Sequence, residues 1–351
     1  MKSNFQVVDT TSKIWLDAFK KLKPEFKDIF YDPKFIEILS KYFNNKKDKI
    51  KCAIYSKKKK LIIYPFLVRN LNTFIKSTFY RNYKDTTGIY GRNWIINSND
   101  IKKENIINFE NNLKGFFLKN KIICSFDRAH PFIDSDLFFK KKITKSVGKF
   151  FFIDLKKDLK VIFSEFKKSL RKEIKKAQKN KNIEFGYIKN SAEIHQFFSI
   201  YTKTMKNKNA KKFYFFKRNF FFDIFNKFKN SCKFYYIKKK NRLLSVELVL
   251  YHKKYAHSYL GGTTEAGKQH YANQLLKYKI ISDLKDKKIE YYLLGAGQKI
   301  DDGVAKYKEG FSNTSFKISK IFFNIWDNKI FYKLKKDFKI NDHQFKNKFQ
   351  F

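Results

Sequence analysis

Apolar residues in the first half of the chain recur with helical spacing in some stretches and in short continuous runs in others. Phe35, Ile36 and Leu39 share one helical face, and the short runs, separated by a turn rich in lysine, are typical of paired strands. The elements expected here are a helix over 34–43, a hairpin of Lys51–Tyr55 and Leu61–Val68, a helix over 102–119, and buried strands at Ile122–Phe126 and Lys149–Leu155.

The second half follows the same mixed pattern. From Asp158 onward, apolar residues at spacings of three and four predict a long helix, and short apolar runs return after residue 230. The elements expected are helices over 159–181, 191–206 and 212–229, a hairpin of Phe234–Ile237 and Leu243–Tyr251 continued by Tyr255–Leu260, a helix over 271–286, and strands at Glu290–Leu294 and Phe316–Phe323. Each half therefore belongs to the α/β (α+β) class, with a mixed central sheet flanked by helices.

The length of 351 residues suggests two domains, at roughly 150 residues per domain. Only 4 prolines and 12 glycines are present, so no linker of that composition marks the boundary. We place the boundary where the pattern becomes strongly helical. The expected division is an N-terminal domain over 1–150, a C-terminal domain over 151–325 and a basic tail over 326–351.

The formal net charge of +46 would ordinarily point to nucleic acid or anionic lipid as a partner. However, Arg occurs at only seven positions, while Lys, Asn, Ile and Phe are abundant, as the codons of an AT-rich genome favour. Because Arg is the better residue for bidentate recognition of phosphates and base edges, we expect no specific DNA binding. The charge still favours an anionic substrate.

The remaining chemistry-bearing residues exclude several classes of protein. Cys52, Cys124 and Cys232 are far apart and lack metal or redox spacing, and the six histidines form no ligand pair, so we expect free thiols and no metal. No signal peptide and no run of about 20 apolar residues is visible. We expect a cytoplasmic protein, with peripheral contact at the inner face of the membrane as the alternative.

Two segments carry charged or aromatic side chains in patterns that could bind a ligand. Lys168, Arg171 and Lys175 lie on one side of the helix expected over 159–181 and could hold phosphates, although a solvated basic face is the simpler explanation in a chain this rich in lysine. The aromatic stretch 213–228 has a stripe that predicts a core-facing helix. Its alternatives are stacking on single-stranded bases and contact with an anionic bilayer.

Several short motifs in the last third of the chain, taken in their order and spacing, resemble the FemAB-like peptidoglycan bridge aminoacyltransferases of the GNAT superfamily. The motifs are Leu243-Leu244-Ser245-Val246-Glu247-Leu248, Tyr259-Leu260-Gly261-Gly262-Thr263, Ala272-Asn273-Gln274-Leu275-Leu276, Leu294-Gly295-Ala296-Gly297, Asp301-Asp302-Gly303 and Lys306-Tyr307-Lys308-Glu309-Gly310-Phe311. The resemblance extends weakly over about 30–325. It implies tandem GNAT-like domains.

The resemblance also implies transfer of an activated acyl or aminoacyl group to an amine of a cell-wall or surface-glycan precursor. No bound cofactor is implied; the donor is an aminoacyl-tRNA or an acyl-CoA, and the partner is an anionic nucleotide- or lipid-linked substrate. The helical arm that some members insert for tRNA is not evident, which leaves the donor open. The alternatives are an acyl-CoA-dependent N-acyltransferase acting on a small amino sugar, and a basic RNA-binding module without catalysis.

The resemblance places the candidate site in the last third of the chain. Lys308 matches the lysine of a family motif, where a cation stabilises an oxyanion or a donor phosphate. Glu247 lies in an apolar strand, where its carboxylate either accepts the amine proton or forms a buried pair with a Lys or Arg. The expected substrate-binding residues are Arg171, Lys168, Lys175, Tyr259, Asn273, Gly295, Gly297 and Asp302, with a plain strand-ending turn as the alternative for the two glycines.

Overall fold

The chain forms two compact units, of which one combines the two ends of the sequence. The structure, a computed structural model, describes residues 4–43, 48–73, 75, 77–89, 94–98, 101–133, 137–139, 142–297, 303–312 and 315–339. The first unit comprises Met1–Val147 and Ser319–Phe351, and the second unit comprises Gly148–Ile318. The second unit is therefore an insertion between two segments of the first.

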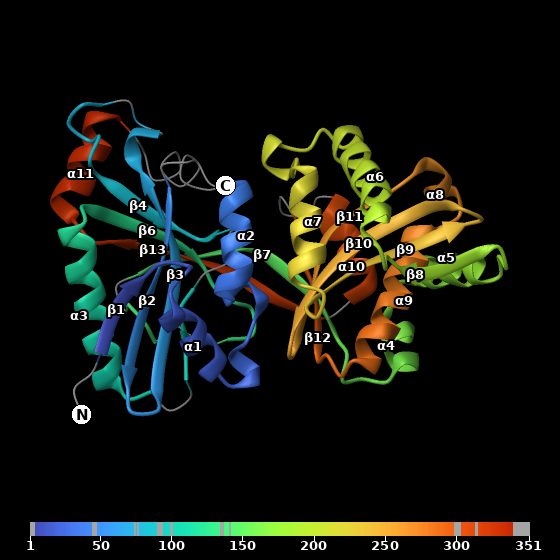
Figure 1. Ribbon diagram of the computed structural model, residues 1–351, viewed down its shortest axis with the longest axis horizontal. Helices are drawn as coiled ribbons and strands as arrows, with labels where there is room; N and C mark the ends of the chain where they lie inside the picture. The colour runs from blue at the N-terminus through green and yellow to red at the C-terminus, as the bar shows by residue number, and fades with distance from the viewer. Residues whose placement is uncertain are drawn as a thin grey trace. The chain divides into compact units, whose positions relative to one another are not determined.

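The first unit is built on a mixed sheet (Figure 1). Adjacent strands run antiparallel, except that β4 and β6 pair in parallel. Its strands, in spatial order, are β1 (Asn4–Val8), β2 (Lys49–Lys57), β3 (Lys60–Asn70), β4 (Lys84–Thr87), β6 (Ile122–Arg128) and β13 (Phe316–Ile325), with β5 (Ile96–Asn97) paired to β3. The expected hairpin is confirmed as β2 and β3.

Helices cover this sheet and connect its parallel strands. They are α1 (Lys13–Lys21), α2 (Pro33–Phe43), α3 (Lys103–Lys119) and α11 (Asn328–Asp337), with short 3₁₀ turns at Pro24–Phe26, Ile29–Tyr31 and Leu71–Thr73. The crossover between β4 and β6 contains α3, as a parallel pair requires. Within the stretch 326–351, for which a basic tail was expected, α11 buries Phe331 and Leu334.

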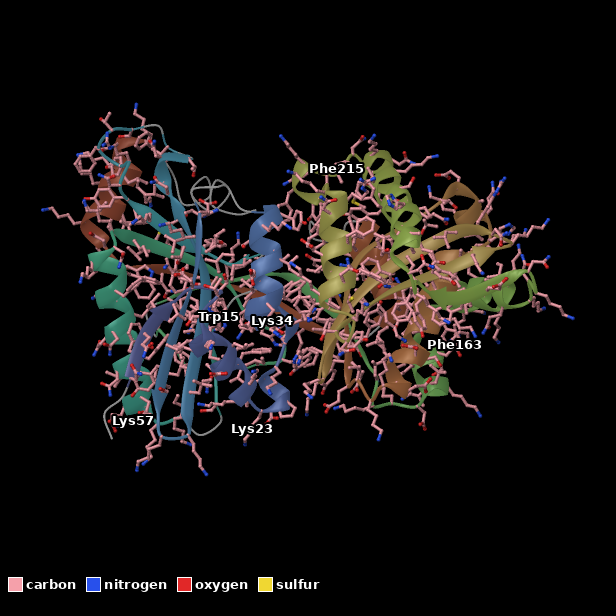
Figure 2. The ribbon with its side chains drawn as sticks, in the orientation of Figure 1. Trp15, Lys23, Lys34, Lys57, Phe163 and Phe215 are labelled. Carbon is pink, nitrogen blue, oxygen red and sulfur yellow. The ribbon has the colours of Figure 1, made fainter. Side chains whose placement is uncertain are left out.

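Aromatic packing and one ion pair hold the first unit together. Trp94 packs against Phe322 of β13, with ring centroids 4.4 Å apart, so the C-terminal segment contributes to this core. Figure 2 marks Trp15 of α1, whose side chain is fully buried. The buried guanidinium of Arg69 forms a bidentate pair with Asp85, at 3.0 and 2.6 Å, which satisfies two charges that would otherwise be costly to bury.

The second unit is likewise built on sheet strands of mixed direction, here called the second sheet. Its strands, in spatial order, are β7 (Ile143–Asp154), β12 (Tyr291–Ala296), β11 (Tyr255–Thr263), β10 (Arg242–His252), β9 (Cys232–Lys239) and β8 (Ile183–Tyr187). The pair of β11 and β12 is parallel, and the other neighbours are antiparallel. Both β7 and β13 cross a unit boundary: the first residues of β7 and the last residues of β13 belong to the first unit, and the rest of each strand belongs to the second unit.

Helices pack on both faces of this second sheet. They are α4 (Leu159–Glu165), α5 (Lys168–Gln178), α6 (Ile194–Asn207), α7 (Arg218–Lys227), α8 (Glu265–Gln269), α9 (Ala272–Asp286) and α10 (Gly303–Ser312), with 3₁₀ turns at Ser191–Glu193 and Lys212–Tyr214. On β9, Phe234 contacts Phe197 of α6, whereas its neighbour Tyr235 bonds Asp283 of α9. Because successive strand residues point to opposite faces, α6 and α9 cover opposite faces.

The single helix expected over 159–181 is wrong. The chain forms two helices, because Phe166 adopts an extended backbone conformation with ψ of 149° between α4 and α5. The break turns the Phe166 ring onto Phe311 of α10, at a centroid distance of 5.2 Å, while Phe163 packs on Tyr278 of α9. Both rings gain buried contacts that one straight helix would not provide.

The two units share one arrangement of strands. In each unit three antiparallel pairings are followed by one parallel pairing with a helical crossover, and an antiparallel strand closes the sheet. In this correspondence β4, α3 and β6 match β11, α9 and β12. The duplication confirms the α/β class expected for both halves, although the sequence shows no visible repeat.

Two further findings concern membrane-spanning helices and metal sites among the described residues. None of the helices within the described ranges is long and apolar enough to cross a membrane. Among the same residues, no group of three or more His, Cys, Asp or Glu side chains is arranged to hold a metal ion.

Candidate active site

A buried ion pair lies at the centre of the second unit. Glu247 projects from β10 and Lys277 from α9, and the Lys277 ammonium donates to both carboxylate oxygens of Glu247 at 2.6 Å. Both side chains are almost fully buried, with 4% and 6% of Lys277 and Glu247 exposed. Of the two roles expected for Glu247, the structure therefore gives it that of a buried pair.

Two hydroxyl groups complete this pair. Lys277 also donates to the hydroxyls of Ser258 at 2.9 Å and Tyr292 at 3.0 Å, and the Tyr292 hydroxyl donates to Glu247. Burial lowers the pKa of Lys277, and the Glu247 charge acts in the opposite direction. Burial and the same charge raise the pKa of Tyr292, so this phenol stays protonated at neutral pH.

A second polar group lies one helical turn away. Asn273, at the start of α9, donates to the Tyr307 hydroxyl of α10 at 2.7 Å and lies 3.4 Å from the Ser245 hydroxyl. Ser245 also lies 3.0 Å from the Thr263 hydroxyl at the end of β11. Burial, and secondarily the Glu247 charge, raises the pKa of Tyr307. Tyr307 therefore keeps its proton and remains a hydrogen-bond donor.

The spacing of these residues explains why both groups form on one face. Ser245 and Glu247 are two residues apart on β10, a step of about 6.6 Å on the same face of a strand. Asn273 and Lys277 are four residues apart on α9, a step of about 6 Å on the same face of a helix. Because the two steps nearly match, α9 presents one partner to each strand residue.

Lys308 follows Tyr307 on α10. Its ammonium donates to the carbonyl oxygen of Ala296, the last residue of β12, at 2.6 Å, and its side chain is half-buried. The helix is anchored at Glu309, whose carboxylate pairs with Lys167 at 3.1 Å and Lys149 at 3.7 Å. Lys308 therefore lies at the carboxyl end of β12. The parallel strand β11 ends at Thr263 on the same edge of the sheet, and Asn273 at the start of α9 lies next to it.

The ladder between β11 and β12 is short. It pairs three residues of each strand and ends at His257 and Leu293, although β11 continues to Thr263 and β12 to Ala296. Gly295 adopts φ of +85°, a conformation that side-chain-bearing residues rarely adopt, at a register shift in the pairing with β7. Gly297 follows directly after the strand. The two parallel strands thus separate toward the end that carries Lys308.

The start of α5 lies close to this region in the fold. The backbone amide of Lys167 donates to the Gly310 carbonyl of α10 at 2.9 Å, so α5 begins beside the helix of Lys308. Arg171 is half-buried, and its guanidinium donates to the carbonyl of Ser164 at the end of α4. Lys168 and Lys175 are exposed.

One of the other expected residues is not brought to this group. Tyr259 occupies a bulge in β11, and its ring packs on Phe216 and Phe220 with centroids 6.1 and 6.4 Å away, on the face that α6 and α7 cover. Asp302 lies outside the described residues, as does its neighbour Asp301. The aromatic stripe in 213–228 is core, as expected, since Phe216, Phe220, Ile224 and Phe228 are buried.

Lys277 and Tyr292 are functional candidates that the sequence did not predict. Lys277 shares the helix face of Asn273 and Ile281 but is one lysine among many, so its burial could be recognised only from an acidic residue inside a neighbouring apolar strand. Glu247 was that signal. Tyr292 lies in the apolar strand β12, where a buried aromatic residue is ordinary, so nothing in the sequence marks it as a site residue.

One protein-family profile matches most of the second unit. Residues 164–309 match the profile of a family described as an acetyltransferase (GNAT) domain. The matched range contains Glu247, Asn273, Lys277 and Lys308. Comparison with curated protein sequences gives no match.

Three solved structures resemble the whole chain. The crystal structure of FemX is 10% identical, covers 94% of this chain and 99% of its own, and has a TM-score of 0.68. The C-terminal domain of a protein assigned as a lysylphosphatidylglycerol synthetase from Agrobacterium fabrum is 10% identical, with 91% and 93% covered and a TM-score of 0.52. A tandem GNAT protein from the clavulanic acid biosynthesis pathway is 7% identical, with 93% and 99% covered and a TM-score of 0.50.

The fold and the matched domain define the class of the protein: it has the GNAT fold, with two such units in tandem. Within that class the chain has the FemAB-like fold, which confirms the resemblance drawn from the motifs of its last third.

Proposed function

We propose that the second unit transfers an acyl or aminoacyl group to an amine of a cell-envelope precursor. The observation that carries this proposal is the placement of Lys308 and the protonated Tyr307 beside the point where β11 and β12 separate. A separated pair of strands offers room for an acyl chain, and polar groups at its end offer donors for the reacting carbonyl. The resemblance to the FemAB-like peptidoglycan bridge aminoacyltransferases, together with the phospholipid in the name of the lysylphosphatidylglycerol synthetase domain, supports the cell envelope as the setting.

In this proposal the neutral amine attacks the acyl carbonyl carbon, a C–N bond forms, and the C–O bond of an ester or the C–S bond of a thioester breaks. Lys308 supplies positive charge to the oxyanion that develops on the carbonyl oxygen. Tyr307, held by Asn273, donates its proton to the leaving oxygen or sulfur, the amine loses one proton to solvent, and solvent returns one proton to the Tyr307 oxygen. Proton and electron counts balance without a covalent enzyme intermediate.

Glu247 has a supporting role in the proposal. Both of its carboxylate oxygens accept hydrogen bonds from Lys277 and Tyr292, so we assign it to positioning α9 rather than to taking the amine proton. Because α9 also carries Asn273, a fixed Glu247 keeps Tyr307 oriented. Gly295 and Gly297 allow the backbone of β12 to turn away from β11 beside the acyl group.

Lys168, Arg171 and Lys175 are proposed to hold the phosphates of the donor. The start of α5 contacts α10, which brings this basic face near Lys308. A guanidinium carries five N–H donors, so one bond to Ser164 leaves Arg171 with further donors for a phosphate. Both donor classes, aminoacyl-tRNA and acyl-CoA, carry phosphates and satisfy this requirement.

A specific observation favours the acyl-CoA donor as the second candidate. Within the described range 142–297, α9 with 15 residues and α6 with 14 are the longest helices, and no long helical arm is inserted for a tRNA. The acceptor in this version is a small amino sugar or another amine. The RNA-binding alternative has no comparable structural support.

The test is a transfer assay with the two donor classes offered separately. Radiolabelled acetyl-CoA or aminoacyl-tRNA is incubated with a peptidoglycan precursor bearing a free amine, or with glucosamine, and the amide product is measured. We expect product from one donor class, abolished by Lys308→Met and retained by Lys306→Met on the same helix. Absence of product and of saturable binding for both donor classes, with folded protein, would refute acyl transfer.

A further inference from the structure

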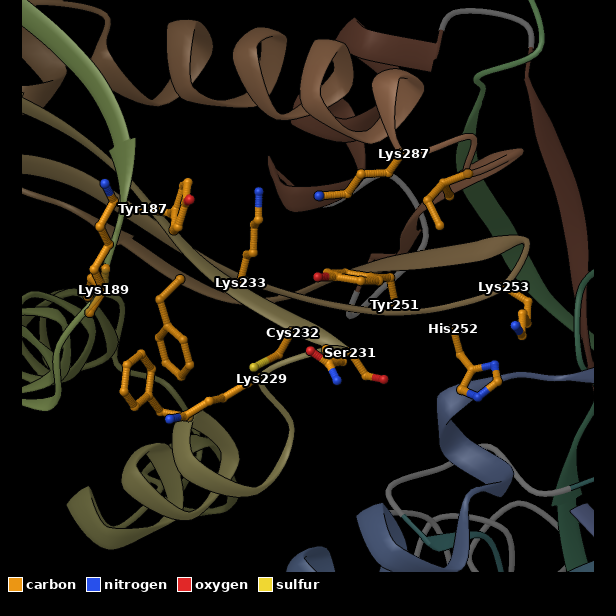
Figure 3. A pocket seen from close by; sticks show the side chains of 15 residues that line it. Tyr187, Lys189, Lys229, Ser231, Cys232, Lys233, Tyr251, His252, Lys253 and Lys287 are labelled. Carbon is orange, nitrogen blue, oxygen red and sulfur yellow. The ribbon is translucent and has the colours of Figure 1, made fainter. Parts of the chain in front are cut away.

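A cavity of about 840 Å³ opens at the other end of the second sheet (Figure 3). It is lined by the end of β8, the start of β9, the end of β10 and the segment after α9, and this volume is within the range that small-molecule sites occupy. Asn273 begins α9 and Lys287 follows its end, which separates the cavity from the candidate active site by about 20 Å along the helix.

Every charged side chain that lines the cavity is basic. The five lysines are Lys189, Lys229, Lys233, Lys253 and Lys287, and no aspartate or glutamate contributes to the lining. Lysines are common on this chain, and in the second unit many pair with carboxylates, as Lys238 does with Glu184. Among the cavity lysines, Lys233 has such a partner in Asp283, which is not part of the lining. A concave surface with one sign of charge concentrates the field and attracts anions.

Lys233 is a fixed cation at the centre of this lining. Its ammonium contacts both carboxylate oxygens of Asp283, at 3.1 and 3.3 Å, and lies 4.2 Å above the ring of Tyr187. Only 16% of its side chain is exposed, whereas a typical surface lysine is mobile. An anion that binds here therefore costs little side-chain entropy at Lys233.

Lys287 supplies a second cation on the same side. Figure 3 shows the Lys233 and Lys287 side chains with their ammonium ends turned toward one another. Burial, and then the charge of Lys233, lowers the pKa of Lys287, while the Asp283 charge acts in the opposite direction. The Asp283 carboxylate thus attracts the ammonium groups of both Lys233 and Lys287. An anion bound between the two ammonium groups would offset the repulsion that remains between them.

The rest of the wall is aromatic. Tyr187, Tyr251 and Phe225 line the cavity beside the lysines. Burial raises the pKa of Tyr251 to about 12, so its hydroxyl is a neutral donor at physiological pH. Burial also raises the pKa of Cys232 to about 12, which keeps this thiol protonated and excludes it as a nucleophile.

We propose that this cavity is a second ligand site, which binds a small phosphorylated molecule of nucleotide size with its phosphate between Lys233 and Lys287. The lysines act as point charges for phosphate oxygens, the Tyr251 hydroxyl donates to the same group, and the aromatic wall contacts the organic part. The proposal does not depend on acyl transfer, because it uses none of the residues assigned to that reaction.

The probes are inorganic pyrophosphate and AMP, titrated calorimetrically into the full chain at about 150 mM KCl, where non-specific attraction is screened. We expect saturable binding at one site, with AMP tighter than pyrophosphate. Lys233→Gln/Lys287→Gln should weaken binding at least tenfold, which is about 1.4 kcal/mol. Lys287→Gln alone should weaken it while leaving the contact of Lys233 with Asp283 intact, which guards against a folding defect.

The matched control is Lys203→Gln/Lys206→Gln, which removes the same charge from exposed positions of α6. We expect this variant to bind within about twofold of the original chain. Equal weakening in the control and cavity variants would show general attraction to a basic protein and overturn the site. Absence of saturable binding would overturn it too, and pyrophosphate binding as tightly as AMP would overturn the nucleotide-sized ligand.

Discussion

The ammonium group of Lys277 contacts both carboxylate oxygens of Glu247 at equal distances of 2.6 Å, inside a core where neither side chain reaches solvent. Each charge is tolerated only because the other is present. The pair joins β10 to α9, and through α9 it fixes Asn273 and the Tyr307 hydroxyl. Stability and site geometry thus depend on one interaction.

This pair predicts a specific stability pattern. Lys277→Met should lower the free energy of unfolding by about 3–5 kcal/mol, because it leaves the Glu247 carboxylate buried and unpaired. The double variant Lys277→Met/Glu247→Gln should recover much of that loss. Urea unfolding of the two variants provides the measurement. A double variant as unstable as the single one would mean that the charge of Glu247 does not cause the loss.

The position of Lys308 predicts a catalytic effect. Lys308→Met should lower the turnover number by roughly two to three powers of ten, the range for loss of one oxyanion donor, with little change in substrate affinity. Its bond to the Ala296 carbonyl, made by a charged donor on a half-buried side chain, contributes at most about 1.5–3 kcal/mol, so the melting temperature should fall only modestly. Near-normal turnover with a large loss of stability would instead make Lys308 a structural residue.

Tyr307 offers a complementary variant. Tyr307→Phe keeps the ring that packs on Phe311 and removes only the hydroxyl that accepts from Asn273. We expect a fall in turnover of roughly ten- to a hundredfold, least for donors with a good leaving group. Steady-state rates with oxygen-ester and thioester donors test this. A fall of equal size for every donor would argue against proton donation to the leaving group.

Arg171 should be distinguishable from its lysine neighbours. Because a planar guanidinium grips phosphate in a fork that lysine cannot reproduce, Arg171→Ala should raise the apparent KM for the phosphate-bearing donor more than Lys172→Ala does. Its bond to the Ser164 carbonyl also predicts a small loss of stability. Measuring KM and melting temperature together separates the two effects. Equal, negligible changes in KM for the two variants would mean that the basic face of α5 is ordinary solvated surface.

Tyr251 predicts a loss of stability in alkali. Its pKa is raised to about 12 in the folded chain, against about 10 when unfolded, so the unfolded state loses its proton first as the pH rises. The stabilisation is fully present below about pH 10 and is lost as the pH rises toward about 12. Between about pH 9 and 11 the melting temperature should fall less for Tyr251→Phe than for the original chain. Identical falls would disprove this contribution.

The surplus charge predicts weak binding to nucleic acid. If most of it reflects codon bias, RNA binding should be indifferent to sequence and should fall steeply between about 50 and 200 mM salt. Fluorescence anisotropy with several RNA sequences at both salt concentrations measures this. Sequence-selective binding that persists at the higher concentration would favour the RNA-binding alternative over acyl transfer.

Most regular elements could be predicted from the spacing of apolar residues, because a strand buried on one face and an amphipathic helix both leave a periodic trace. The hairpin of β2 and β3, the helix α3 and the helix α9 were expected nearly at their observed bounds. The short strand β4 and the helix α10 were not expected. Periodicity over so few residues is ambiguous, and Tyr307, Lys308 and Phe311 fit a strand end as well as a helix.

The candidate site could be predicted only in part. Lys308 and Asn273 were found through family motifs, and Glu247 through its cost inside an apolar strand. Lys277 could not be found, because a sequence does not show which of many lysines a fold buries. Tyr259 was misplaced since a bulge in β11, which alternation of residues cannot reveal, turns its ring toward α7.

The closing strand of the first unit comes from the far end of the chain, and this sets an order of events during synthesis. Until residues 319–325 leave the ribosome, β6 lacks its neighbour β13 and Trp94 lacks the ring of Phe322. Every strand of the second unit is complete by then. Domains commonly fold as they emerge, N-terminal first, but here the inserted unit can reach its native state while the N-terminal segment waits. The early part of this protein is therefore the part that needs protection from aggregation longest.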